Sequence, residues 1–283
     1  MKVVDAIDIL YNDGIHVEVM LPDQGRNDNM VDMLSFSGFA LLGEYAAGKA
    51  VFISKELNDG DIALLKSYLP ALIITTEKTS RLLHEKIQGP TIIITNNPKL
   101  AFALLASHTD LGQYVRFRHD DIHPTAIIDD DVILQGNNHI GPHTIIGCEG
   151  LNIYRFKNKL YNTTHVGGVI IGLGVRIGNN CSIQRAVIGN TEIGSYTLIA
   201  HNVMIGHGVV IGKENVISSG AMISGSVTTG NNVYIGPGVT VKNGISIGDN
   251  SFIGVGSNVI HDIPDDTVAA GNPARVMKGK RPW

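Results

Sequence analysis

The strongest constraint on the fold is an aliphatic residue that returns at every sixth position through the second half of the chain. From residue 193 to residue 259 this period runs without a slip, and Gly or another small residue usually follows. Only Thr229 breaks the aliphatic rule in that run. Neither a helical period of 3.6 nor strand alternation produces such spacing, whereas hexapeptide repeats are typical of a parallel β-helix. We therefore expect a mainly β fold with one short strand and one turn in each unit.

The repeat also supplies a register. Three units close one triangular coil of about 18 residues, and coils stack at the strand-pairing distance of about 4.8 Å. A residue and the one 18 positions later therefore lie on the same face. Earlier positions with the same period are Ile122, Ile128, Leu134, Ile140 and Ile146, and then Ile171, Ile177 and Ile183. We expect the β-helix to span residues 121–265, with a C-terminal tail at 266–283.

Two interruptions break this register. The larger, "CEGLNIYRFKNKLYNTTHVGG" at 148–168, is aromatic, basic and too long for a corner. Insertions in a solenoid map to loops that are often functional, so we expect either a structureless excursion or a loop that binds substrate or a neighbouring subunit. A shorter phase shift between residues 183 and 193 predicts a local bulge.

Residues 1–120 show a different pattern. Apolar runs at 50–53, 71–76 and 91–95 alternate with helix-like segments "DGDIALLKSYL", "KTSRLLHEKI" and "NPKLAFALLASH", which predicts a small α/β domain. No G-x-G-x-x-G motif follows the first strand, so we do not expect NAD.

The net charge and its distribution indicate which kinds of binding partner to expect. The 283 residues carry a formal charge of −4, with acidic and basic side chains mixed along most of the chain, which gives no reason to expect nucleic acid or an anionic membrane. No stretch approaches the roughly 20 apolar residues of a membrane span. The start "MKVVDAIDIL" lacks signal-peptide features and only two cysteines occur, so we expect a cytoplasmic protein with reduced thiols.

Because a β-helix specifies no activity, a site must be found among its side chains. Two histidines in "TLIAHNVMIGHGVVIG" are candidates. The register stacks His207 against Gly225 and His201 against Ser219, while up to about 20 Å of extended chain separates the two histidines. An imidazole is a natural general base, and a glycine N–H can bind an oxyanion. This favours His207 with Gly225; the alternative is that both histidines are solvent-facing corner residues without a role.

The stretch from "GGVIIG" at 167–172 through "HGVVIGKENVISSGAMISGSV" resembles the hexapeptide-repeat acyltransferases, in particular the UDP-3-O-acylglucosamine N-acyltransferases of lipid A biosynthesis. The resemblance implies that His207 is the catalytic base and that Gly225 supplies the oxyanion N–H. The end, "DNSFIGVGSNVIHDIPDDTVAAGNPARVMKGK", is similar instead to sugar O- and N-acetyltransferases that use acetyl-CoA. Both likenesses imply a left-handed helix and a homotrimer with clefts between subunits.

The N-terminal half resembles the lipid A family through "LSF", "KAVFI" and "NNPKLAFALLASH", but the substrate contacts differ. Where that family contacts uridine with Asn and Tyr, this sequence has Phe39 and Leu42. A second substrate-binding histidine of the family falls near Gly244, and we expect no counterpart of the family's C-terminal helical extension toward acyl carrier protein. These departures predict the same reaction on different substrates.

We therefore expect an N-acyltransferase that transfers an acyl group, most simply acetyl, from acyl-CoA to the amino group of a nucleotide-linked amino sugar in surface polysaccharide biosynthesis. The first domain would hold the nucleotide. Further candidates for substrate contacts are His201, Asn202 and Lys242. Gly225 and the basic residues Arg275 and Lys278, with Lys280 and Arg281, are candidates for binding CoA. We expect no permanently bound cofactor and no metal.

Several alternatives remain open. One is a lipid A type N-acyltransferase that takes its acyl group from acyl carrier protein, and another is an O-acetyltransferase on the same fold. A zinc enzyme of the carbonic anhydrase type needs three converging imidazoles, and the spacing of the candidates His119, His123, His139 and His143 does not match that family's pattern. A non-catalytic scaffold is the last alternative, and it predicts that replacing His207 changes nothing.

Overall fold

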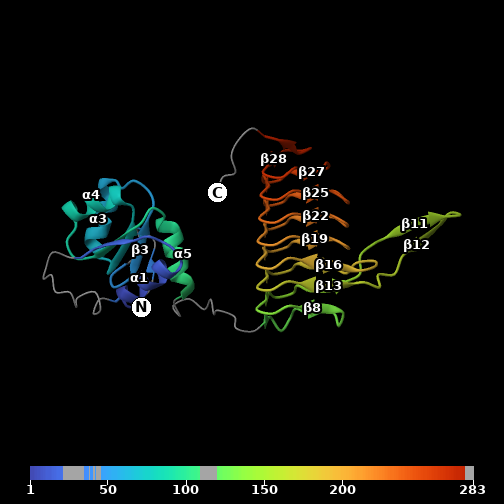
Figure 1. Cartoon of the computed structure of the whole chain (residues 1–283), viewed down its shortest axis with the longest axis horizontal. Coiled ribbons are helices and arrows are strands. Elements are labelled where there is room, and N and C mark those ends of the chain that lie inside the picture. The colour runs from blue at the N-terminus through green and yellow to red at the C-terminus, as the bar shows by residue number, and fades with distance from the viewer. Residues whose placement is uncertain (22–34, 38, 41, 43–45, 109–119, 278–283) are drawn as a thin grey trace. The chain divides into compact units, whose positions relative to one another are not determined.

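The computed structural model describes residues 1–21, 35–37, 39–40, 42, 46–108 and 120–277. The chain divides into two compact units, Met1–Arg116 and Phe117–Trp283 (Figure 1). The expected fold class, a parallel β-helix preceded by a small α/β domain, is confirmed. No helix in the described part of the chain has both the length and the apolar character needed to cross a membrane.

The first unit is a five-stranded sheet with helices on both faces (Figure 1). The strand order is β1-β5-β4-β3-β2, and only β1 runs antiparallel to its neighbour. The strands are β1 (Glu18–Met20), β2 (Phe39–Ala40), β3 (Ala50–Ile53), β4 (Leu72–Thr75) and β5 (Thr91–Ile94), and the helices are α1 (Val3–Asn12), α3 (Asp59–Tyr68), α4 (Glu77–Lys86) and α5 (Pro98–His108). The sequence predicted β3, β4, β5 and the last three helices, but not α1, β1 or β2.

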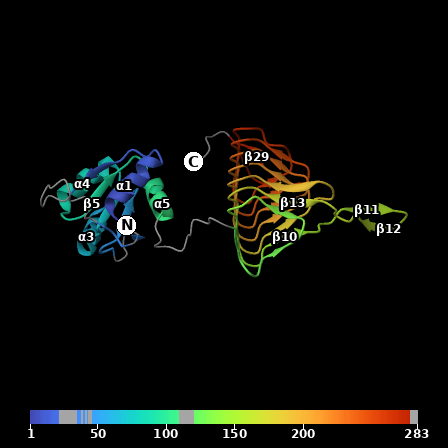
Figure 2. The same cartoon turned by 60° about the horizontal axis from the view of Figure 1, so that its bottom comes forward.

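Strand β4 shows why these strands appear as unbroken apolar runs in the sequence. Leu72 and Ile74 belong to one buried cluster with residues of α1 and α5, while Ile73 belongs to another with residues of α3 and α4. Both faces of the strand are therefore covered, as is usual for parallel sheets. Figure 2 shows the same two layers of helices from another side.

The second unit is a β-helix whose coils contribute to three parallel walls, visited in the order wall 1, wall 2, wall 3. Wall 1 contains β6 (Asp121–Ile122), β9 (His139–Ile140), β14 (Arg176–Ile177), β17 (Leu198–Ile199), β20 (Val216–Ile217), β23 (Tyr234–Ile235), β26 (Phe252–Ile253), β28 (Val268–Ala270) and the antiparallel β29 (Arg275–Val276). Wall 2 contains β7 (Ile127–Ile128), β10 (Ile145–Cys148), β15 (Ser182–Gln184), β18 (Met204–Ile205), β21 (Met222–Ile223), β24 (Thr240–Val241) and β27 (Asn258–Val259). Wall 3 contains β8 (Val132–Leu134), β13 (Gly168–Ile171), β16 (Asn190–Ile193), β19 (Val210–Ile211), β22 (Thr228–Thr229) and β25 (Ser246–Ile247).

The register of the repeat is confirmed by the strand pairing. Ile193 pairs with Ile211 in wall 3, and Ile199 pairs with Ile217 in wall 1. Hydrogen bonds between neighbouring coils likewise join residues 18 positions apart, as from the Lys213 N–H to the Asn231 side chain. The aliphatic residues of the repeat point inward and form one continuous buried cluster along the β-helix.

Thr229, the single exception in the long repeat, has a specific partner inside the β-helix. Its hydroxyl oxygen accepts hydrogen bonds from the Asn215 side-chain amide at 3.0 Å and from the Gly212 N–H at 3.2 Å. Asn215 is itself buried. Because a buried amide needs hydrogen-bond partners, Thr229 replaces an aliphatic residue where Asn215 enters the core.

The two interruptions of the repeat meet in the structure. The larger one is not a structureless excursion but an antiparallel hairpin of β11 (Ile153–Phe156) and β12 (Lys159–Asn162), which projects away from the coils in both views (Figures 1 and 2). Where the insertion returns, the N–H groups of Val166 and Gly167 donate to the carbonyls of Val187 and Ala186 in the bulge. The segment between β15 and β16 thus holds the end of the insertion through backbone hydrogen bonds.

The β-helix continues beyond the expected end at residue 265. Strand β28 lies within the segment that we expected to be a tail, and its Val268 and Ala269 pair in parallel with Phe252 and Ile253 of wall 1. The inward-facing Ala269 is fully buried. Ala269 takes an inward position that larger aliphatic residues hold in the earlier coils, so the aliphatic repeat did not mark this strand.

Candidate active site

His207 lies at the corner between wall 2 and wall 3, directly after β18. A β-carbon built on Gly225, one coil further, would come within 2.7 Å of the Cε1 and Nε2 atoms of the His207 ring. The imidazole therefore packs on the bare α-carbon of Gly225, and only glycine fits at that position without moving the ring. The stacking of His207 on Gly225 that the register predicted is present, while their chemical role stays a prediction.

The N–H of Gly225 has no hydrogen-bond partner among the described residues, although its neighbours are engaged. The Ser224 N–H donates to the Val241 carbonyl at 3.1 Å, and the Ser226 N–H donates to the His207 carbonyl at 2.9 Å. A β-carbon on Gly206 would lie only 2.6 Å from the Gly225 nitrogen. Glycine at 206 therefore places no side-chain atom against this amide, which leaves its N–H free to donate, as an oxyanion donor requires.

The insertion contacts His207 at both of its ends. His165, near the C-terminal end, is only 2% exposed, and its ring lies edge-on to that of His207, with 5.3 Å between centroids and 75° between planes. At the other end, a β-carbon on Gly150 would lie 3.3 Å from Cδ2 of His207. The sequence analysis singled out neither residue; the one available signal was that the insertion leaves and rejoins the corner that carries His207.

The surroundings of His207 favour its neutral form. Partial burial lowers the pKa of His207, and the neighbouring His165 lowers it further. Arg185, at the bulge beside this corner, does not add a free charge, because its guanidinium pairs with Asp129 at 2.8 Å and with Asp131 at 3.2 Å. A neutral imidazole is the state that a general base needs.

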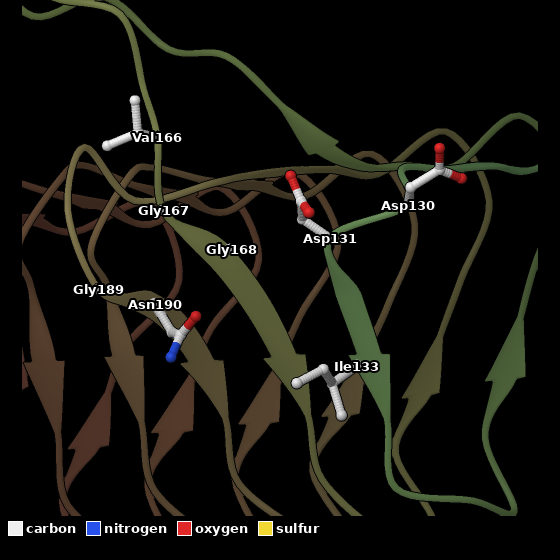
Figure 3. Close-up of a pocket in the computed structure, with 8 residues that line it drawn as sticks. All are labelled: Asp130, Asp131, Ile133, Val166, Gly167, Gly168, Gly189 and Asn190. Carbon is white, nitrogen blue, oxygen red and sulfur yellow. The ribbon is translucent and has the colours of Figure 1, made fainter.

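A pocket of about 530 Å³ opens at the same corner (Figure 3). It lies where β8, β13 and β16 begin, and Val166 places the end of the insertion on its rim. Its lining consists of Asp130, Asp131, Ile133, Val166, Gly167, Gly168, Gly189 and Asn190. Backbone and carboxylate groups therefore dominate the wall next to His165.

The other candidate substrate contacts are divided between two corners. His201 and Asn202 follow β17 at the corner between wall 1 and wall 2, so they are not brought to His207. The Nδ1 atom of His201 accepts the Asn179 N–H at 2.9 Å, which is a role within the fold. Lys242 follows β24 directly and is exposed at the corner that carries Gly225.

Arg275 is exposed in β29, near the last coil. Lys278, Lys280, Arg281 and His119 lie outside the described residues. His139 contacts Asp121 at 2.7 Å, and His123 contacts the Thr125 hydroxyl at 3.0 Å. Within the described ranges, no group of three or more His, Cys, Asp or Glu side chains is placed to hold a metal ion.

Comparison with known proteins agrees with the geometry of the coils. Residues 190–225 match the family described as bacterial transferase hexapeptide (six repeats). The second unit is a hexapeptide-repeat β-helix. A UDP-3-O-acylglucosamine N-acyltransferase of Acinetobacter baumannii is 40% identical to the chain over 74 residues, 24% of this chain and 21% of the relative. The chain thus spans about a fifth of the length of this relative.

Solved structures resemble the hexapeptide-repeat β-helix over more of its length. LpxA from Bacteroides fragilis, a UDP-N-acetylglucosamine acyltransferase, aligns with a TM-score of 0.50 at 22% identity, covering 56% of this chain and 60% of that one. Perosamine N-acetyltransferase from Caulobacter crescentus aligns with a TM-score of 0.38 at 16% identity, covering 78% and 76%. The expected left-handed β-helix is confirmed as the fold.

Proposed function

We propose that the protein is an N-acyltransferase that transfers an acyl group from acyl-CoA to the amino group of a nucleotide-linked amino sugar, for surface polysaccharide assembly in the cytoplasm. One observation carries this proposal: His207, whose pKa is lowered by burial, lies against a glycine whose N–H is unengaged among the described residues. Base and oxyanion donor are the two groups that acyl transfer from a thioester requires. The name of the 40% identical relatives, which are N-acyltransferases of a UDP-linked glucosamine, supports the same reaction type.

The proposed chemistry uses few groups. His207 removes a proton from the sugar amine as its nitrogen attacks the thioester carbonyl, and a C–N bond forms. The Gly225 N–H stabilises the negative charge on the oxygen of the tetrahedral intermediate. Collapse of the intermediate breaks the C–S bond and releases CoA thiolate, which leaves readily because thiol pKa values lie near 8.5. The proton that His207 took up passes to the thiolate or to solvent, which restores the neutral base and gives the amide and free CoA, so no separate general acid is needed.

The nucleotide of the acceptor is left open in this proposal, because the two positions at which the lipid A family contacts uridine carry apolar residues here. Phe39 lies at one position where that family contacts uridine, and here its ring packs against Phe36 and Phe102 at centroid distances of 5.5 and 4.9 Å. Leu42, at the other position, packs against the core between the sheet and the helices α3 and α4. Apolar packing thus takes the place of polar contacts to a base.

Acetyl-CoA is the donor that we propose, with the exposed Arg275 and with Lys278 available for its phosphates. A lipid A type reaction with acyl carrier protein is the second candidate, and the 40% identity to UDP-3-O-acylglucosamine N-acyltransferase over 74 residues favours it. The His207 and Gly225 pair would also serve a hydroxyl acceptor. Product analysis separates these cases because an amide survives mild alkali and an ester does not.

A homotrimer is part of the proposal, and the outer face of wall 1 supports it. Leu198, Val216, Tyr234 and Phe252 form an outward-facing ladder on successive coils. Leu198 is 44% exposed, and the rings of Tyr234 and Phe252 stack at 4.6 Å. Such an apolar face is suited to contact with another copy of the chain.

The experiment that tests the function is a thiol-release assay with acetyl-CoA and a panel of UDP-, dTDP- and GDP-linked amino sugars. We expect release with one nucleotide series and mass spectrometry showing an added acetyl amide. No release from acetyl-CoA, but transfer from an acyl carrier protein thioester, would favour the second candidate. No transfer from either donor to any acceptor would contradict the proposal.

A further inference from the structure

The residue that the structure adds to the site is His165. It belongs to the insertion, yet 98% of its accessible surface is covered, and its ring contacts His207 edge-on. Neither of its ring nitrogens has a hydrogen-bond partner among the described residues. A buried imidazole without such partners lowers the free energy of unfolding. A residue kept at such a cost is a candidate for a role in function.

His165 is firmly placed by its own backbone. The next two N–H groups, those of Val166 and Gly167, donate to the Val187 and Ala186 carbonyls at 3.0 and 3.1 Å. A β-carbon on Gly167 would lie 2.3 Å from the Gly189 carbonyl oxygen, so the chain can only approach the bulge this closely as glycine. The insertion therefore holds the His165 ring against His207 even though its hairpin extends outward.

We propose that His165 is a positioning residue that holds the His207 ring against Gly225. The proposal rests on the proposed function, because it assigns His165 a role through the base. His165 is too deeply covered to touch a substrate itself. Its edge-on contact, with Gly225 behind the ring and Gly150 beside it, leaves the His207 imidazole little freedom to rotate.

The electrostatic part of this role follows from the groups that face His207. The insertion contributes His165. Arg185, which follows β15 on the preceding coil, has its charge paired with Asp129 and Asp131. The next coil contributes the uncharged Ser224, Gly225 and Ser226. Burial lowers the pKa of His207, and among these neighbouring groups only His165 lowers it further. Removing the His165 ring should therefore raise that pKa, while replacing it with another ring of similar size should raise it less.

The test compares His165→Phe and His165→Ala with the wild-type protein, and uses Tyr161→Ala on the exposed strand β12 as the matched control within the insertion. NMR titration of the His207 imidazole, assigned with His207→Ala, reports its pKa without any need for activity. We expect that pKa to rise in both His165 variants, more in the alanine variant. The acidic limb of kcat/KM should move to higher pH in parallel.

The value of kcat at pH 8 tests the positioning role separately, because we expect His207 to be neutral at that pH in every variant. His165→Phe should keep kcat within about threefold, while His165→Ala should lose on the order of tenfold or more, as expected for a loosened base. An unchanged His207 titration in both variants, or an equal loss in Tyr161→Ala, would overturn the proposal. Inactive wild-type protein with a shifted His207 titration would instead contradict the proposed function and leave the His165 contact established.

Discussion

The imidazole of His207 packs on the α-carbon of Gly225 so closely that any β-carbon at position 225 would come within 2.7 Å of two ring atoms. Base and oxyanion donor are therefore not independent groups. The same missing side chain that leaves room for the ring also brings the Gly225 amide to the ring's own corner. A substitution at position 225 must disturb both parts of the proposed chemistry.

Gly225→Ala should consequently lower kcat by about 10²-fold, since small displacements of a catalytic group are costly. The fold should survive, because the nearest atoms that the added methyl group would meet belong to the His207 side chain. Thiol release measures kcat, and circular dichroism shows whether the fold is kept. Ser224→Ala, at the preceding residue, is the control and should retain activity. A Gly225→Ala enzyme with wild-type kcat would contradict the packing of the site.

The pH dependence of kcat/KM should show the lowered pKa of His207. Only neutral His207 can accept a proton, so activity should fall as pH drops through its pKa. Burial and His165 hold that pKa below its usual value of 6.5, so the acidic limb should lie below 6.5 and the profile should be flat from there toward pH 8. A limb centred above pH 7 would mean that His207 is not the titrating base.

Thr229→Val should destabilise the protein although it restores the aliphatic repeat. The change removes one acceptor of the Asn215 amide and one of the Gly212 N–H inside the core. The Asn215 amide keeps the Gly212 and Gly230 carbonyls and the Gly212 N–H keeps the carbonyl of residue 229, so we expect the net cost of a lost hydrogen bond, about 0.5–1.5 kcal/mol. Denaturant unfolding measures the free energy. Thr228→Val, the exposed neighbour on the same strand, is the control and should change stability by less than about 0.5 kcal/mol.

His201→Ala should weaken the fold rather than the reaction. It removes the acceptor of the Asn179 N–H, at a cost of about 1 kcal/mol, and leaves the corner that carries His207 intact. Thermal unfolding and kcat should therefore respond differently, with a lowered Tm and a kcat near that of the wild type. A loss of kcat as large as that of His207→Ala would show that the two corners act together.

The length of each coil decides which parts of the site the sequence could predict. The register stacked His207 on Gly225 because both lie inside an unbroken run in which every coil has the same length. His165 could not be placed in the same way, since the insertion lengthens its coil and pairs residues 37 positions apart instead of 18, as for the Val175 N–H and the Asn138 side chain. Only the hydrogen bonds from Val166 and Gly167 to the bulge bring it back to His207, and these depend on backbone geometry that no repeat encodes.

The same limit applies to the ends of each unit. Wall 1 continues through Val268 and Ala269, where a buried alanine takes the inward position that an aliphatic period would mark with a larger residue. In the first unit, β3 and β4 were predictable because burial on both faces makes them continuous apolar runs. The short edge strands β1 and β2 have only two or three residues and carry no such signal.

Thiol release by His207→Ala, with acetyl-CoA and the preferred nucleotide-linked amino sugar, tests directly whether His207 is the general base. The loss of a general base predicts a decrease in kcat on the order of 10²–10⁴-fold with unchanged unfolding behaviour. His201→Ala, six residues away at another corner, should stay near the wild-type rate. Wild-type turnover in His207→Ala would contradict the assignment of this site.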